Sequence, residues 1–184
     1  LALFYTTSYL PYFVDRYKVL IADYPYGTGL TPRLASWTQL TVQQVCSDYL
    51  AIADAAGMSQ FSFAGYWFGG SPAQQLAPRT NRLTAVAIGG WPALGAPHAD
   101  LLAISSALCA IDFLDLTNVK MNVAYYQRLQ SWPEYPNVSA LTVPRLNYVD
   151  AQDVTNILGH EANMIARFRE NRATLDSLGW ATTG

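Results

Sequence analysis

The stretch Phe61-Ser62-Phe63-Ala64-Gly65-Tyr66-Trp67-Phe68-Gly69-Gly70 decides the fold. Its first four residues predict a β-strand, and the glycines that follow predict a tight turn. Pro72 then predicts the start of a helix that ends by Pro78. Gly65 and Gly69 lie two residues on either side of Trp67. A residue flanked in this way is held in a strained turn between a strand and a helix.

The segments around this turn alternate between strand and helix. Thr41 and Gln44 form a capping box that opens a helix stopping at Gly57. Short apolar runs predict further strands at residues 18–23, 84–88 and 143–149, with a possible earlier strand at 1–5. The last predicted element is a helix at residues 161–178, which Gly179 ends. Residues 10–17 have room for about two helical turns.

Residues 99–132 have helical spacing and no strand signal, which indicates an insertion of two helices. Short strands separated by helices predict an α/β fold, with a doubly wound, mostly parallel sheet and a small helical cap. We therefore expect core segments at 1–98 and 133–184, and the cap at 99–132.

The composition narrows the classes of function. The 184 residues are enough for one domain. Charged residues make up 13% of the chain, and the net charge of −2 provides no basic surface, so nucleic acid is not an expected partner. Cys46 and Cys109 match no disulfide framework or metal-ligand spacing, which favours a reducing cytoplasm. The apolar runs are too short and broken to span a bilayer, and we expect no membrane contact, metal or cofactor.

Three motifs resemble the α/β-hydrolase family. The spacing Gly65-Tyr66-Trp67-Phe68-Gly69 is that of the G-x-Ser-x-G nucleophile elbow, with Trp67 in the place of serine. Residues 23–29 are similar to the D-x-P-G-x-G turn, although Tyr26 stands where glycine is common. Residues 143–153 are similar to the late strand P-x-L-x-x-x-G-x-x-D, whose last acid orients the catalytic histidine. The resemblance makes Asp153 that acid and places the family's cap at 99–132.

The resemblance also shows what the chain lacks. The indole of Trp67 has no oxygen and donates only, so it cannot attack a carbonyl. The backbone N–H of Phe68 stands where the family has an oxyanion donor. Ser62 and Ser71 do not lie at the elbow centre, and we expect them to be structural. The family's histidine follows one more strand, and the chain ends at Gly184, so we expect a short or truncated fold with no histidine in that place.

The remaining candidates are weaker. Pocket-lining roles are assigned to Tyr66, Trp91, His98 and Tyr125, although core packing is an alternative for the aromatic residues. His160 is expected near the start of the closing helix. Several carboxylates are interpreted as solvated, namely Asp112, Asp115, Glu134 and Asp176.

Three functional hypotheses follow. In the first, the chain belongs to a lineage that acts on esters or related small apolar substrates. Because its catalytic triad is incomplete, we expect the chain to be inactive or severely impaired, and whether it is an enzyme stays open. The alternative is a pseudoenzyme that binds a small apolar ligand or a partner. The third is water activated by His98 or His160 with an Asp. If the strand at 145–149 is an exposed sheet edge, it also predicts a homo-oligomer.

Overall fold

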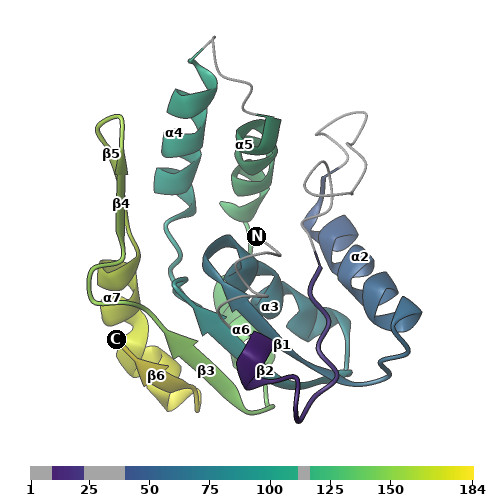
Figure 1. The fold of residues 1–184 in the computed structure, drawn as a ribbon. Helices are drawn as coiled ribbons and strands as arrows, with labels where there is room; N and C mark the ends of the chain where they lie inside the picture. The colour runs from purple at the N-terminus through teal and green to yellow at the C-terminus, as the bar shows by residue number, and fades with distance from the viewer. Residues whose placement is uncertain (1–9, 23–39, 112–116) are drawn as a thin grey trace.

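The computed structural model describes residues 10–22, 40–111 and 117–184. Four parallel strands form one sheet in the order β1-β2-β3-β6, and an antiparallel hairpin forms a second sheet (Figure 1). The parallel strands are β1 (Phe61–Tyr66), β2 (Leu83–Gly89), β3 (Arg145–Tyr148) and β6 (Ala181–Thr183). The hairpin consists of β4 (Val154–Ile157) and β5 (His160–Asn163). The predicted α/β class and parallel sheet are confirmed.

Helices connect the strands and flank the sheet. They are η1 (Leu10–Tyr12), α2 (Val42–Ala55), η3 (Trp67–Gly69), α3 (Gly70–Leu76), η4 (Ala77–Arg79), α4 (His98–Cys109), α5 (Thr117–Leu129), α6 (Glu134–Ala140) and α7 (Met164–Ser177). The two predicted helices of residues 99–132 are present as α4 and α5, which pack against each other and project away from the sheet (Figure 1). That this pair is a cap stays a prediction. No helix within the described ranges is both long and apolar enough to cross a bilayer.

The ends of α2 agree with the sequence pattern. Thr41 is extended, and its hydroxyl oxygen accepts a hydrogen bond from the backbone N–H of Gln44 at 3.0 Å. Gly57 follows the helix with φ at +67°, a conformation that favours glycine and ends the helix. Local chemistry therefore fixes both ends of α2.

The strand predicted at residues 18–23 is not a strand over 18–22, its described part. Val19 and Leu20 are 39% and 44% exposed, and none of the described strands pairs with them. An apolar run indicates a need for burial, but a strand also requires a neighbour with free backbone groups. Asp23, the turn at 24–29 and the candidate strand at 1–5 lie outside the described residues.

The helix predicted over 161–178 begins later, at Met164, because residues 160–163 form strand β5. Leu158 and Gly159 have φ of +53° and +79° and form the turn between β4 and β5. His160 is therefore exposed in a hairpin and does not lie at a helix start.

Strand β6 corrects the expectation of an exposed edge at β3. Leu146 pairs with Ala181 and Tyr148 with Thr183, in parallel. Gly179, with φ at +79°, reverses the chain after α7, and the N–H of Trp180 donates to the carbonyl of Leu175 at 3.0 Å. The next residue is thus already in strand position. The exposed edge at β3 therefore no longer supports a homo-oligomer, which stays a prediction.

Candidate active site

The turn after β1 has the backbone expected of a strained elbow. Tyr66 is extended, with φ at −119° and ψ at 138°. Trp67 then adopts φ at +53°, a left-handed conformation that costs a residue with a Cβ atom about 1 kcal/mol or more. The chain continues through η3 into α3. Trp67 is thus the central residue of a sharp strand-to-helix turn.

The glycines around Trp67 are required by space. A Cβ atom on Gly65 would lie 1.9 Å from the carbonyl oxygen of Gly69. One on Gly70 would lie 2.8 Å from Cγ2 of Ile88 and 2.9 Å from Cβ of Trp91. Strand and helix therefore approach as closely as the sequence spacing predicts.

The side chains of the elbow face the core. Trp67 and Phe68 are half-buried and pack against the hydrophobic core. The Phe68 ring lies 5.1 Å from that of Tyr125 and 5.8 Å from that of Tyr126, centroid to centroid. The role of the Phe68 N–H as an oxyanion donor stays a prediction.

Asp153 and Tyr66, the last residue of strand β1, lie on either side of the space next to Gly90. A Cβ atom on Gly90 would be 3.0 Å from the Tyr66 ring and 3.2 Å from Oδ2 of Asp153, so both side chains border the same glycine. Oδ2 is buried and has no hydrogen-bond partner within the described ranges. Burial and then the nearby charge of Asp150 raise the pKa of Asp153. The structure thus brings together Tyr66 and the residue in the acid position.

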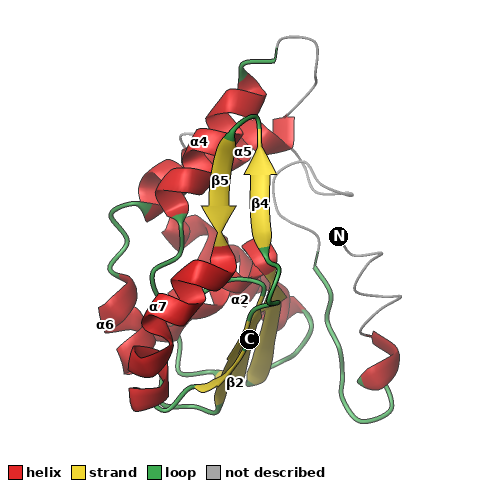
Figure 2. Ribbon diagram, turned by 90° about the vertical axis from the view of Figure 1, so that its left-hand side faces the viewer, coloured by secondary structure: helices red, strands yellow, loops and turns green. Residues whose placement is uncertain are grey.

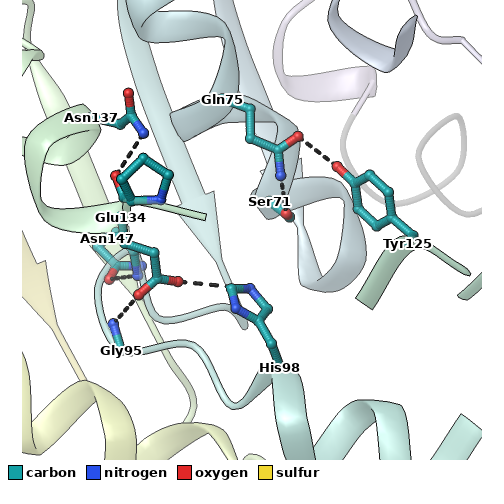
Figure 3. Close-up of polar contacts among 10 residues, drawn as sticks. Ser71, Gln75, Gly95, His98, Tyr125, Glu134, Asn137 and Asn147 are labelled. Carbon is teal, nitrogen blue, oxygen red and sulfur yellow. Dashed lines mark hydrogen bonds and ion pairs between the residues drawn. The ribbon is translucent and has the colours of Figure 1, made fainter. Parts of the chain in front are cut away.

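Tyr125 belongs to a buried chain of hydrogen bonds. Its hydroxyl donates to Oε1 of Gln75 at 2.5 Å, and Nε2 of Gln75 donates to the hydroxyl oxygen of Ser71 at 2.6 Å (Figure 3). Burial raises the pKa of Tyr125 above its usual range. Ser71 is fully buried in α3, as expected of a structural serine. Tyr125 and Trp91 are both fully buried, and their lining of a pocket stays a prediction.

His98 and Glu134 face each other in the interior. Nε2 of His98 lies 3.7 Å from Oε1 of Glu134 (Figure 3), and in the part of the chain that the structure describes neither atom has a hydrogen-bond partner. Oε2 of Glu134 accepts the N–H of Gly95 at 2.7 Å. Burial lowers the pKa of His98 to about 4 and raises that of Glu134 to about 7. Both side chains are therefore driven toward their neutral forms.

This arrangement corrects one expectation. Glu134, interpreted from the sequence as solvated, has a side chain only 14% exposed. It is the first residue of α6, and the contact with the loop 90–97 turns it inward. Activation of a water by His98 requires an Asp within hydrogen-bond distance of the imidazole. Among the described ion pairs, the carboxylate that faces His98 belongs to Glu134 and lies 3.7 Å away, so this pair does not support the water-activation hypothesis for His98.

Asn147 is a buried polar residue that the sequence reasoning did not single out. Its Oδ1 accepts the N–H of Ala93 at 2.9 Å, and its Nδ2 donates to the carbonyls of Ile88 and Trp91 at 3.0 and 2.8 Å. It joins β3 to the loop 90–97. The only signal in the sequence is an amide in the middle of an apolar strand. Within the described residues, no three metal-ligating side chains lie close enough to hold an ion.

Solved structures with known folds resemble this chain, whereas no family model and no curated protein matches it. A hydrolase from Pseudomonas aeruginosa PA01 is 16% identical over 100% of this chain and 76% of the other, with a TM-score of 0.67. The enol-lactonase from Burkholderia xenovorans LB400 is 19% identical over 86% and 69%, with a TM-score of 0.57. An alpha/beta hydrolase from Sphaerobacter thermophilus DSM 20745 is 14% identical over 85% and 70%, with a TM-score of 0.52. The chain therefore has the α/β-hydrolase fold.

Proposed function

We propose that this chain derives from the ester- and lactone-cleaving α/β hydrolases and has lost their covalent mechanism. The observation that carries the proposal is Trp67 at the centre of the elbow, with φ at +53°. The enol-lactonase with a similar fold supports small esters and lactones as the ligand class. Fold likeness alone does not assign a reaction, because one fold can host many reactions and the residues of the site determine which one occurs.

The chemistry of the elbow supports inactivity. An acyl-enzyme needs an oxygen or sulfur nucleophile, and an indole N–H is a donor only. Among the residues that the structure describes, Oδ2 of Asp153 in the acid position has no hydrogen-bond partner, which supports a site whose acid orients no imidazole. His98 instead faces Glu134, and His160 pairs with Ile157 at the far end of the hairpin from Asp153. Nucleophile and general base are thus both missing from the described site.

Turnover of p-nitrophenyl acetate and butyrate, and of a small lactone, tests this proposal. We expect no rate above a heat-denatured control and no labelling by a fluorophosphonate probe. Trp67→Ser is expected to remain inactive and unlabelled, because no imidazole is in place to accept the serine proton. Trp67→Ala is the matched control for lost indole packing. Labelling or turnover of the unchanged chain that a serine-directed phosphonate abolishes would overturn the proposal.

A second candidate is binding of such ligands without cleavage. It is favoured by the half-buried indole of Trp67, which offers an apolar face at the elbow. Titration of tryptophan fluorescence with small apolar esters and their acids tests it. A saturable change that Trp67→Phe reduces would support binding at the elbow, and no saturable change with any ligand would reject it.

A further inference from the structure

The helical pair α4–α5 is connected to the rest of the fold by two junctions that have the same kind of turn. At the first, the N–H of His98 donates across Pro97 to the carbonyl two residues earlier at 2.8 Å, and Pro97 has φ at −78° and ψ at 58°. At the second, the N–H of Glu134 donates across Pro133 in the same way at 2.9 Å, with φ at −78° and ψ at 79°. Both are inverse γ-turns. The helices α4 and α6 begin directly after them.

The two residues that follow these turns meet in the interior. Oε2 of Glu134 accepts the N–H of Gly95, which precedes the first turn, and Oε1 lies 3.7 Å from Nε2 of His98, which follows it (Figure 3). One carboxyl group from the second junction therefore spans the first. Both side chains are largely buried. A displacement of about 1 Å would bring Oε1 and Nε2 to hydrogen-bond distance.

The surroundings of the pair are apolar and aromatic. The Trp91 ring lies 5.7 Å from that of His98 and stacks on Tyr126 of α5 at 6.5 Å. Burial lowers the pKa of His98 and raises that of Glu134, and no charged side chain in the described ranges contributes to either shift. Other ionisable side chains on α4 and on the elements next to α4 and α6 are exposed or bound to other partners, namely Arg79, Asp100, Lys120, Arg128, His160, Glu161 and Arg167.

The helical pair has further attachments that do not include His98 or Glu134. Tyr125 and Tyr126 of α5 pack against Phe68 of the elbow, and the Tyr125 hydroxyl donates to Gln75 of α3. Figure 2 shows hairpin β4–β5 alongside α4, and β5 packs against that helix. Because burial raises the pKa of Tyr125 above its usual range, its contact with Gln75 does not titrate near neutral pH. The pair of helices is thus held at the junctions by groups that titrate, and at the elbow by groups that do not.

We propose that His98 and Glu134 hold one proton between them and act as a clamp that keeps both junctions of the α4–α5 pair closed. In the closed form the proton lies on Glu134, whose pKa is raised from 4.5 to about 7, and His98 is neutral, with its pKa lowered from 6.5 to about 4. When the clamp opens into water, the proton passes from the Glu134 carboxyl to the His98 imidazole. Both forms then carry one proton between about pH 4.5 and 6.5, so the clamp is insensitive to pH in this range. Either group alone would make the junction a pH-operated hinge.

Hydrogen exchange followed by mass spectrometry tests the clamp through local opening of α4 and α5, with β2 as the reference for global unfolding. Exchange rates are corrected for their intrinsic pH dependence. In the unchanged chain we expect the opening to change by less than about threefold between pH 5 and 6.5. In Glu134→Gln the opening should increase on the order of tenfold for each unit by which the pH falls, and in His98→Gln for each unit by which it rises.

Two control variants separate the clamp from a general loosening of the helices. Tyr125→Phe removes the hydrogen bond to Gln75 at the elbow and should increase the opening by the same factor at every pH, because no titrating group is lost. The double variant His98→Gln with Glu134→Gln should also open more than the unchanged chain, without dependence on pH.

A second measurement needs no change to the pair. His98 and His160 are the two histidines of the chain, so His160→Gln leaves the ¹⁵N ring resonances of His98 as those of a single residue. We expect these resonances to stay those of a neutral imidazole from pH 5 to 6.5, and the ¹³C carboxyl resonance of Glu134 to stay that of a protonated acid.

Three outcomes would overturn the proposal. In the first, the opening of Glu134→Gln and that of His98→Gln change with pH in the same direction or not at all. In the second, α4 and α5 exchange only as fast as β2 in every chain, so that they open only when the whole fold unfolds. In the third, His98 takes up a proton, or Glu134 is ionised, between pH 5 and 6.5; this outcome decides the matter even if the single variants do not fold. None of these readouts involves ester cleavage or ligand binding, so the clamp is independent of the proposed function.

Discussion

Asn147 and Glu134 fasten the same loop, residues 90–97, with different chemistry. Asn147 is neutral, and its amide binds one N–H and two carbonyls. Glu134 binds the N–H of Gly95 with one oxygen, and its other oxygen, opposite His98, has no hydrogen-bond partner among the residues described. The first contact does not titrate, whereas the second depends on two groups whose pKa values burial has moved in opposite directions. Asn147 thus stabilises the loop by hydrogen bonds alone, whereas the contribution of Glu134 also depends on its protonation.

Removing the amide of Asn147 should have the largest effect. Asn147→Ala leaves the N–H of Ala93 and the carbonyls of Ile88 and Trp91 without this partner, and each buried orphan costs about 1–3 kcal/mol. We expect a loss of about 3–5 kcal/mol in the free energy of unfolding, measured by urea denaturation, with little pH dependence. Asn156→Ala, exposed in β4, should change it by less than about 0.5 kcal/mol. A loss below about 1 kcal/mol in Asn147→Ala would contradict this role.

Glu134→Gln should expose the pH dependence of His98. With a folded pKa of about 4 against 6.5 unfolded, His98 takes up its proton first in the unfolded chain, so stability falls as pH falls from 6.5 to 4. The slope is about 1.4 kcal/mol per pH unit, or about 3 kcal/mol in all. In the unchanged chain Glu134 offsets this slope. The unfolded chain carries one proton on His98 and the folded chain carries one on Glu134, so the number of bound protons does not change on folding. Equal slopes in both proteins would reject the coupling.

His98→Gln should produce the opposite slope. Glu134 alone has a folded pKa of about 7 against 4.5 unfolded, so its contribution is fully present below 4.5 and is lost as pH rises to 7. We expect a smaller total than for Glu134→Gln, because the Glu134 side chain is 14% exposed and that of His98 is 7%. Urea denaturation between pH 4.5 and 7 measures it. Stability that is flat or rises over this range would show that Glu134 is not buried in its neutral form.

Asn137→Ala should give the smallest effect. Asn137 donates through Nδ2 to the carbonyl of Pro133 at 2.6 Å, within one turn of α6 (Figure 3). We expect a loss of about 1 kcal/mol in thermal or urea unfolding and no change in pH slope. A changed slope would mean that the position of α6, and not the charge of Glu134, controls the titration.

The parts of the fold that the sequence predicted are those fixed by local chemistry. Thr41 with Gln44, and Gly65 with Gly69, specify a helix start and a sharp turn through contacts a few residues apart. The β4–β5 hairpin was missed because its turn is Leu158-Gly159, where Asn-Gly or Asp-Gly would have been recognised.

The rest depended on partners that are remote in the sequence. The run at residues 18–22 has strand composition but no described strand beside it. A lone carboxylate such as Glu134 carries no local sign that it faces a histidine 36 residues away, nor does Asn147 indicate which loop it binds. The elbow could thus be predicted residue by residue, while the polar contacts that hold the loop after β2 could not.

The contact between Asn147 and the carbonyl of Ile88 joins residues 59 apart, and the strands they occupy are parallel. Such pairing has to close a long loop, and the entropy lost on closing it is not offset by contacts between residues close in sequence. We therefore expect the pairing to form late in folding. We infer that α4, α5 and α6 form before β3 reaches β2. Removal of the Asn147 amide should then mainly speed unfolding and leave the refolding rate nearly unchanged.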